Sequence, residues 1–102
     1  MAIRQHFQKA LMLLDHGDID RGETILRQVI VDAGNEDDQV ALVQSLVCLG
    51  NLLYETSRHS EARPYLEQAL QVKGDDDLDD LLSYEFEKAR EILDGLNISP
   101  IW

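Results

Sequence analysis

The chain has 102 residues, the length of a single domain, and its composition is 44% apolar and 28% charged, as is usual for a folded domain. Nine Lys and Arg residues against twenty Asp and Glu residues give a net charge of −11, and residues 75–102 carry seven of these excess negative charges. The balance argues against nucleic acid and anionic membrane surfaces as partners, because binding to either uses clustered basic residues. A basic partner, or simply high solubility, fits this charge better.

The cysteine content and the N-terminal segment predict a cytoplasmic protein. Cys48 has no second cysteine to pair with and lies in an apolar stretch, so we expect a small core residue. The first residues lack a signal-peptide pattern, and no run of 18 apolar residues offers a membrane-spanning helix.

Apolar residues recur at helical spacing along most of the chain and predict an all-α fold of five helices. The first helix spans residues 3–15 and ends near Gly17, a natural residue for a helix C-terminus. Asp18 or Asp20 then caps the second helix. The apolar residues of this second helix are Ile25, Leu26, Val29, Ile30 and Ala33.

The third and fourth helices follow a polar break at residues 34–38, whose acidic residues suit a helix N-terminus. Residues 39–56 are apolar around most of the helix circumference, so we expect neighbours on more than one side. Ser60 is the expected N-cap of the fourth helix, which places Pro64 in the first turn, where its missing N–H costs least. Gly74 is expected to end this helix.

A fifth helix is predicted over residues 78–96, opened by the acidic residues 75–77. The residues expected on its buried face are Leu78, Leu81, Leu82, Phe86, Ala89, Ile92, Leu93 and Leu96. Residues 97–102 form an apolar tail that ends in Trp102. We expect this tail to fold back over the fifth helix, and docking on another subunit or a partner is the alternative.

A shift of forty residues overlays the chain on itself. The matched pairs are Leu13 with Leu53, Ala10 with Gly50, Gly22 with Ala62, Leu26 with Leu66, Val29 with Ala69, Gly34 with Gly74, and Leu42 with Leu82. Residues 1–96 are therefore predicted to form one domain of two helix–turn–helix units, 3–34 and 43–74, closed by the fifth helix. The recurring small residues would let the helices approach closely.

The second unit resembles the tetratricopeptide repeat. The residues that carry the resemblance are Leu49-Gly50, Leu53-Tyr54, Ser60-Glu61-Ala62 and Tyr65-Leu66-Glu67-Gln68-Ala69-Leu70. The first unit is a weaker copy, with Gly22 and Val29 where the family usually has Ala, and Arg90 departs from the pattern in the fifth helix. The family repeat is 34 residues long, and the longer period here is attributed to extra linker residues in 34–38.

The resemblance implies a right-handed superhelical stack of antiparallel helix pairs that binds a peptide or partner domain on its concave face. The implied function is a non-catalytic adaptor or assembly factor. The residues mapped to this face are Arg4, Phe7, Leu11 and Leu14 in the first unit, and Gln44, Val47, Asn51, Tyr54 and Glu55 in the second. Asn51 matches a position that the family uses to hold a ligand backbone. Some members of the family bind C-terminal carboxylates with a basic clamp, but Val47 and Leu11 stand where that clamp needs Lys or Asn. The apolar members of the set could instead be core or dimer contacts.

The sequence suggests two further interaction surfaces, one acidic and one apolar. The acidic residues Asp75, Asp76, Asp77, Asp79 and Asp80 support an alternative function, in which a small inhibitor or immunity-type protein blocks a basic partner. The exposed apolar N-terminal face of a short array could support a homodimer. A free-standing relative of a regulator's sensor domain is a third possibility.

No metal, cofactor or catalytic site is predicted. Asp75, Asp77 and Asp79 match alternate positions of an EF-hand loop, but Asp80 stands where Gly is required and Phe86 where the bidentate Glu is required. The three histidines, which lie in different segments without ligand spacing, are His6, His16 and His59. No nucleophile–base pairing or Gly-rich phosphate loop is present, so we expect no enzyme activity.

Overall fold

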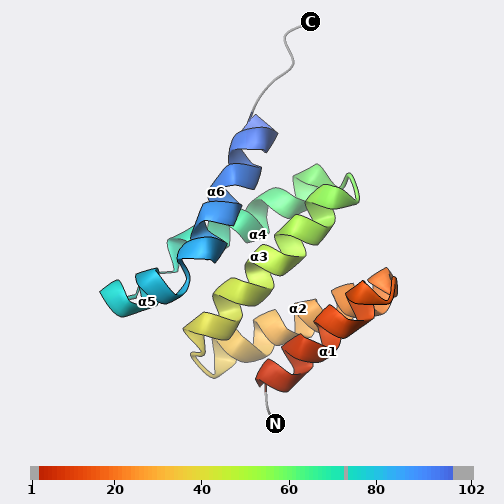
Figure 1. The fold of residues 1–102 in the computed structure, drawn as a ribbon, viewed down its shortest axis with the longest axis horizontal. Coiled ribbons are helices and arrows are strands. Elements are labelled where there is room, and N and C mark those ends of the chain that lie inside the picture. Colours follow the sequence, from red (N-terminus) through yellow and green to blue (C-terminus); the bar gives the residue numbers. More distant parts are fainter. Residues whose placement is uncertain (1–2, 73, 98–102) are drawn as a thin grey trace, which may run out of the picture.

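The computed structural model describes residues 3–72 and 74–97, and all the regular secondary structure in these two ranges is helical (Figure 1). The six helices are α1 (Ile3–Asp15), α2 (Ile19–Asn35), α3 (Gln39–Glu55), α4 (His59–Gln71), α5 (Asp76–Leu81) and α6 (Ser83–Asn97). None of them combines the length and apolar character needed to cross a membrane. The Trp102 tail, residues 98–102, lies outside the described residues.

The three turns that connect α1 to α4 share one backbone pattern, in which the residue before each new helix's N-cap has a positive φ. These residues are Gly17 (φ 83°), Asp37 (φ 57°) and Ser57 (φ 65°). The next amide in each turn donates a hydrogen bond to a carbonyl in the preceding helix: Asp18 to Leu13 at 2.8 Å, Asp38 to Ala33 at 2.9 Å, and Arg58 to Leu53 at 2.8 Å. Such bonds satisfy carbonyls that a helix end leaves unpaired.

These turns fix where the following helices begin. The side chains of Asp18 and Asp38 cap α2 and α3, accepting hydrogen bonds from the amides of Arg21 and Ala41. The predicted cap at Ser60 is wrong because the third turn starts α4 two residues earlier, after Arg58, whose side chain makes no capping bond.

The earlier start of α4 moves Pro64 beyond the first turn. Its missing N–H leaves the carbonyl of Ser60 without a helical partner, and both residues are exposed, so water can hydrate that carbonyl.

The long forty-residue period has a different cause from the one expected. Residues 34 and 35 belong to α2, which continues to Asn35, so the extra length lies in the helix and not in a longer linker. Both α2 and α3 have 17 residues. The three turns therefore recur every twenty residues along the chain.

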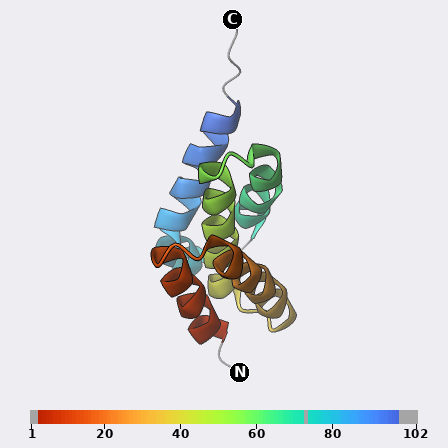
Figure 2. The ribbon, with the colours of Figure 1, turned by 90° about the vertical axis from the view of Figure 1, so that its right-hand side faces the viewer.

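The helices form two layers around α3. Viewed from the side, α3 lies between the edge formed by α1 and α6 and the layer formed by α2 and α4 (Figure 2). Nine of the residues of α3 are buried, and α3 packs against α2, α4, α6 and α1. This confirms the prediction that the third helix has neighbours on more than one side.

The prediction of a single fifth helix over residues 78–96 is wrong, because the chain bends at Leu82 and forms two helices. Leu82 is fully buried, whereas Leu81, expected on the same buried face, is 65% exposed. The bend lets α6 pack on α3 and α4 while α5 buries no residue. The fourth helix also ends earlier than predicted, at Gln71, because Val72 takes an extended conformation in place of a helical one before Gly74.

Small residues allow the close helix contacts that the repeat predicted. A Cβ atom added to Gly50 of α3 would lie 2.5 Å from Leu66 Cδ2, and one added to Gly22 of α2 would lie 2.6 Å from Leu14 Cδ2. Real Cβ atoms do not approach other atoms so closely, so each glycine is required by the side chain that faces it.

A polar cluster joins α2 to α4. Glu23 accepts hydrogen bonds from Arg27 at 2.8 Å and from Arg58 at 2.6 Å, and its side chain is only 14% exposed. Arg58 also binds Glu61 at 2.8 Å, and Arg27 donates to the hydroxyl of Tyr65 and lies 5.5 Å from the centre of its ring. We call these five residues the Glu23 cluster. Hydrogen bonding by Arg58 lowers the pKa values of Glu23 and Glu61.

Candidate functional site

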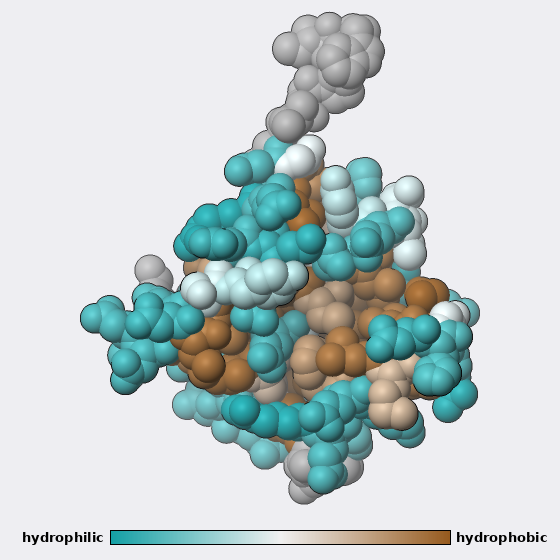
Figure 3. Space-filling view, in the orientation of Figure 1, coloured by the Kyte–Doolittle hydropathy of each residue, from teal (hydrophilic) through white to brown (hydrophobic). Residues whose placement is uncertain are grey.

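A groove of about 270 Å³ lies where α1, α3 and α6 meet. The lining residues are Phe7 and Leu11 of α1, Gln44, Val47, Cys48 and Asn51 of α3, and Tyr84 and Glu85 of α6. We call it the α1–α3–α6 groove. Apolar surface gathers over the middle of this face of the molecule and is framed by hydrophilic residues (Figure 3).

Helical spacing explains how the groove is built. Phe7 and Leu11 are four residues apart on α1, and the four residues of α3 recur at intervals of three and four, so each set shares one face of its helix. Tyr84 and Glu85 lie in the first turn of α6, directly after the bend at Leu82. The bend separates α5 from α6, and the first turn of α6 lines the same groove as α1 and α3.

The floor and rim of the groove differ in exposure. Val47 is 5% exposed and forms part of the core as well as the groove lining. At the rim, Leu11 is 37% exposed and Tyr84 is 69% exposed. The rim thus presents apolar surface that the chain itself leaves uncovered.

Polar groups at one side of the groove are oriented by a hydrogen bond. Asn51 Nδ2 donates to Glu55 Oε1 at 3.1 Å, one helical turn along α3. This bond directs the amide nitrogen toward Glu55 and turns the amide oxygen of Asn51 the opposite way. Burial, with a smaller contribution from the charge of Glu55, raises the pKa of the Cys48 thiol to about 11.

Five of the nine residues predicted for the concave face line this groove: Phe7, Leu11, Gln44, Val47 and Asn51. The structure therefore brings together residues from both predicted units.

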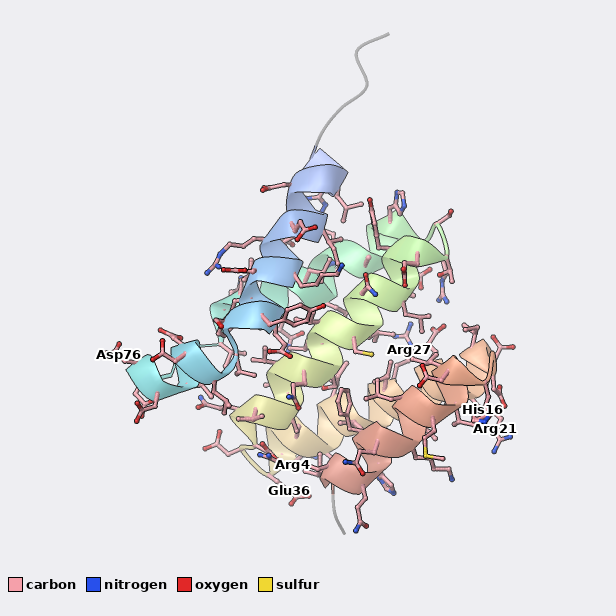
Figure 4. The ribbon with its side chains drawn as sticks, viewed as in Figure 1. Arg4, His16, Arg21, Arg27, Glu36 and Asp76 are labelled. Carbon is pink, nitrogen blue, oxygen red and sulfur yellow. The ribbon has the colours of Figure 1, made fainter. Side chains whose placement is uncertain are left out.

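The other four predicted residues lie outside the groove lining, and each has a different contact. Arg4, near the N-terminal end of α1, forms an ion pair with Asp38 at 3.2 Å (Figure 4). Leu14 packs against Gly22. The ring of Tyr54 stacks on the ring of His59 with centroids 5.0 Å apart. The fourth is Glu55, which holds Asn51 in place.

Three lining residues were not among those predicted: Cys48, Tyr84 and Glu85. Cys48 was expected in the core, and it is in fact partly buried and packed against the core. The forty-residue shift that relates Leu42 to Leu82 also relates Gln44 to Tyr84, so the repeat held the signal for Tyr84.

The acidic residues predicted as a second surface lie on and beside α5. Asp75 caps this helix by accepting a hydrogen bond from the Leu78 amide at 2.9 Å, and all five predicted aspartates are exposed. Asp76 lies on the left side of the view in Figure 4, whereas α1 lies on the right. No group of three or more His, Cys, Asp or Glu residues within 3–72 and 74–97 has the arrangement needed to hold a metal ion.

A second hollow of about 350 Å³ separates α5 and the start of α6 from the end of α4. Its charged lining residues are Asp79, Glu87 and Arg90. The mixture of both charge signs gives this hollow less electrostatic preference for one kind of ligand than a groove with one charge sign has.

Comparison of the chain with protein-family models, with curated proteins and with solved structures found no match to it.

Proposed function

We propose that this chain is a tetratricopeptide-like, non-catalytic adaptor or assembly factor of the cytoplasm, which holds a peptide or a segment of a partner protein in the α1–α3–α6 groove. The observation that carries the proposal is the convergence of side chains from three helices, distant in sequence, on one partly apolar groove. Exposed apolar surface gathered in a hollow, rather than scattered singly, is typical of a binding site.

The proposed architecture is a right-handed stack in which α1–α2 and α3–α4 are the two repeat units. The equal turns every twenty residues support it, because they give successive helices the same change of direction. In this arrangement α6 takes the place of the first helix of a third unit, which explains why its first turn lines the groove beside α1 and α3.

The groove fits a side chain better than a whole small molecule. Its volume of about 270 Å³ lies at the lower limit of small-molecule pockets, which span roughly 300–1,000 Å³. A bulky apolar side chain of a partner would displace water from Phe7, Leu11 and Val47. The amides of Gln44 and Asn51 would pair with the backbone on either side of that anchor.

Paired variants test this proposal without disturbing the core. Leu11→Ser with Tyr84→Ala removes the exposed apolar rim of the groove. Val31→Ser with Leu81→Ala is the matched control, because Val31 is 54% exposed, Leu81 is 65% exposed, and neither lines the groove. Proteins captured from a native lysate at high salt should be retained by the wild type and the control and lost with the groove variant. Equal retention by all three would refute the groove as the binding site.

Cys48 provides a direct measure of occupancy, because it lines the groove and is the only cysteine of the chain. A bound partner should slow alkylation of Cys48 at least about fivefold in the wild type and in the control variant. Unchanged alkylation in a stoichiometric complex would place the partner elsewhere on the surface.

The acidic surface supports a second candidate function, inhibition of a basic partner. The observation in its favour is that α5 buries none of its residues, although it carries four of the five aspartates. Asp76→Asn with Asp77→Asn and Asp79→Asn should release a partner of this kind, and the same partner should dissociate in high salt. A partner lost with these variants and retained by the groove variant would favour the inhibitor function.

Self-association through the N-terminal face is a further proposal, based on the exposure of Met12 on α1. Light scattering at high micromolar concentration tests it. A dimer mass that Met12→Ser converts to a monomer mass supports the proposal, and a monomer mass for the wild type contradicts it.

A further inference from the structure

We infer that the α1–α3–α6 groove binds a cationic segment, in which an arginine next to a bulky apolar anchor lies on the ring of Tyr84 and pairs with Glu85. This inference rests on the proposed function and specifies the chemistry of the partner. It follows from the charge of the lining, from the direction of the polar groups, and from the exposure of Tyr84.

The lining of the groove has one charge sign. Glu85 is the charged residue among the eight that line it, and Lys and Arg are absent from them. Glu85 takes part in none of the ion pairs formed within the described ranges, so its carboxylate is available to a partner. The basic residues of the three adjoining helices are Arg4 and Lys9 on α1 and Lys88 and Arg90 on α6. Arg4 is paired with Asp38, Arg90 lines the second hollow, and neither Lys9 nor Lys88 lines the groove.

A second carboxylate supports the same preference from α3. Glu55 accepts a hydrogen bond from Asn51, so the amide oxygen of Asn51 is left to accept a hydrogen bond from a ligand. Glu55 lies on the same face of α3 as Cys48, two turns away, and its charge adds to the effect of burial in raising the pKa of that thiol. The groove therefore offers acceptors and negative charge, which complement N–H donors and positive charge.

Tyr84 makes arginine a better fit than lysine. Tyr84 is 69% exposed and lines the groove together with Glu85, so a guanidinium bound there can stack on the ring and donate two parallel hydrogen bonds to the carboxylate. The chain already contains such an arrangement, because Arg27 lies 5.5 Å from the centre of the Tyr65 ring while it binds Glu23. The ammonium group of lysine cannot form the paired hydrogen bonds.

Selection from a random-peptide display library tests this inference. Peptides enriched on the wild type are kept for analysis only when the Leu11→Ser/Tyr84→Ala variant fails to bind them and the Val31→Ser/Leu81→Ala control binds them. We expect these groove-dependent peptides to share a bulky apolar residue with an arginine near it. Groove-dependent peptides that are neutral or acidic would overturn the inference and leave the proposed function standing. If no enriched peptide depends on the groove, both fail.

Charge variants sharpen the test on the selected peptides. Glu85→Gln should weaken binding by about fivefold to tenfold, the effect of losing one charge-assisted interaction at a partly exposed site. Glu91→Gln, an exposed change on the same helix outside the groove, should alter the affinity less than about twofold.

Charge reversal gives the strongest contrast. A second selection against Glu85→Lys should enrich acidic peptides in place of the arginine-containing ones. Replacement of the peptide arginine by lysine should weaken binding to the wild type, and this loss should be smaller with Tyr84→Ala. Affinities that are the same for Glu85→Gln, Glu91→Gln and the wild type would remove Glu85 from the site and overturn the inference.

Discussion

The helix pairs α1–α2 and α3–α4 each contain a close contact between a glycine and a leucine, but the glycine lies on opposite helices in the two pairs. In the first pair Gly22 on the second helix faces Leu14, and in the second pair Gly50 on the first helix faces Leu66. The forty-residue shift relates Gly22 to Ala62 and Gly50 to Ala10, so each pair has one glycine and one alanine at these two positions. The packing thus requires a pair of small residues, and either helix can supply the smaller one.

The two helix pairs also differ in how easily the leucine that faces the glycine can move. Leu66 is fully buried in the core, whereas Leu14 is partly exposed. A buried side chain in a close-packed core cannot move aside without displacing others, but a partly exposed one can turn toward solvent. The second pair should therefore tolerate a larger residue at its glycine less well than the first.

Gly50→Ala should have the largest effect on stability. The new Cβ atom would lie 2.5 Å from Leu66 Cδ2, and the resulting displacement of Leu66 should exceed the gain in helix propensity. We expect a loss of about 2 kcal/mol in the free energy of unfolding, measured by chemical denaturation.

Gly34→Ala is the control for that substitution, because nothing lies within 4 Å of a Cβ atom at this exposed position in α2. It should stabilise the protein by about 0.5 kcal/mol through helix propensity alone. A neutral or stabilising Gly50→Ala would mean that α3 and α4 are not as tightly packed as the structure has them.

Glu23→Gln should have the next largest effect, because it removes the charge that holds Arg27 and Arg58 together between α2 and α4. We expect a loss of about 1.5 kcal/mol at pH 7, typical of a hydrogen bond between charged groups. The exposed Glu67→Gln on α4 is the control and should change stability by less than about 0.5 kcal/mol.

The pH dependence of this loss follows from the direction of the Glu23 shift. Its pKa is lowered in the folded state from an ordinary value of 4.5, so the ionised form adds stability at pH values above 4.5. This stability disappears as the pH falls below 4.5 and through the folded-state pKa. The difference between the wild type and Glu23→Gln should therefore shrink with acidification over that range. A difference that stays constant down to pH 2 would contradict the ion-pair explanation.

Gly22→Ala should destabilise the protein by about 1 kcal/mol, half the effect of Gly50→Ala, because Leu14 can move toward solvent. Denaturation of both variants under the same conditions provides the measurement. The double variant Gly22→Ala/Leu14→Ala should lose this clash, so the alanine at position 22 should cost nothing when position 14 is also alanine. A persistent cost would place the clash elsewhere.

The sequence alone predicts those helix ends that are determined by residues close by in the chain. The helix ends near Gly17, Asp18 and Asp38 are fixed by turn and capping residues within a few positions, and these were predicted within a residue or two. The bend at Leu82 was missed because Leu81 and Leu82 are both apolar and fit one continuous helix equally well. Contacts of α6 with α3 and α4 decide between the two arrangements, and these contacts are not encoded in local spacing.

The groove likewise combines residues that the sequence predicted with contacts that it did not predict. The family resemblance mapped Phe7, Leu11 and Val47 to one surface, and in the structure the three residues line one groove. Helical spacing could not anticipate that Arg4 would pair with Asp38, a residue 34 positions away, or that Glu85 would complete the lining beside Tyr84. Both outcomes depend on how the helices sit relative to one another.

Substitutions in the turns are expected to have the smallest effect on stability. The turn within each helix pair contains one residue with a positive φ, so the two turns can be compared directly. Gly17 and Ser57 occupy equivalent positions with φ values of 83° and 65°, a region that costs a residue with a Cβ atom about 1 kcal/mol. Ser57→Gly should therefore stabilise the protein by about 0.5 kcal/mol, because the greater freedom of glycine in the unfolded chain offsets part of the gain. Gly17→Ser should destabilise by a similar amount, since nothing within 4 Å would obstruct the new side chain and only the backbone angle matters. Thermal unfolding of the two variants and of the double variant measures both effects, and the double variant should match the wild type. Shifts of the same sign for the two single variants would show that the turns, despite their shared hydrogen bonds, are not equivalent.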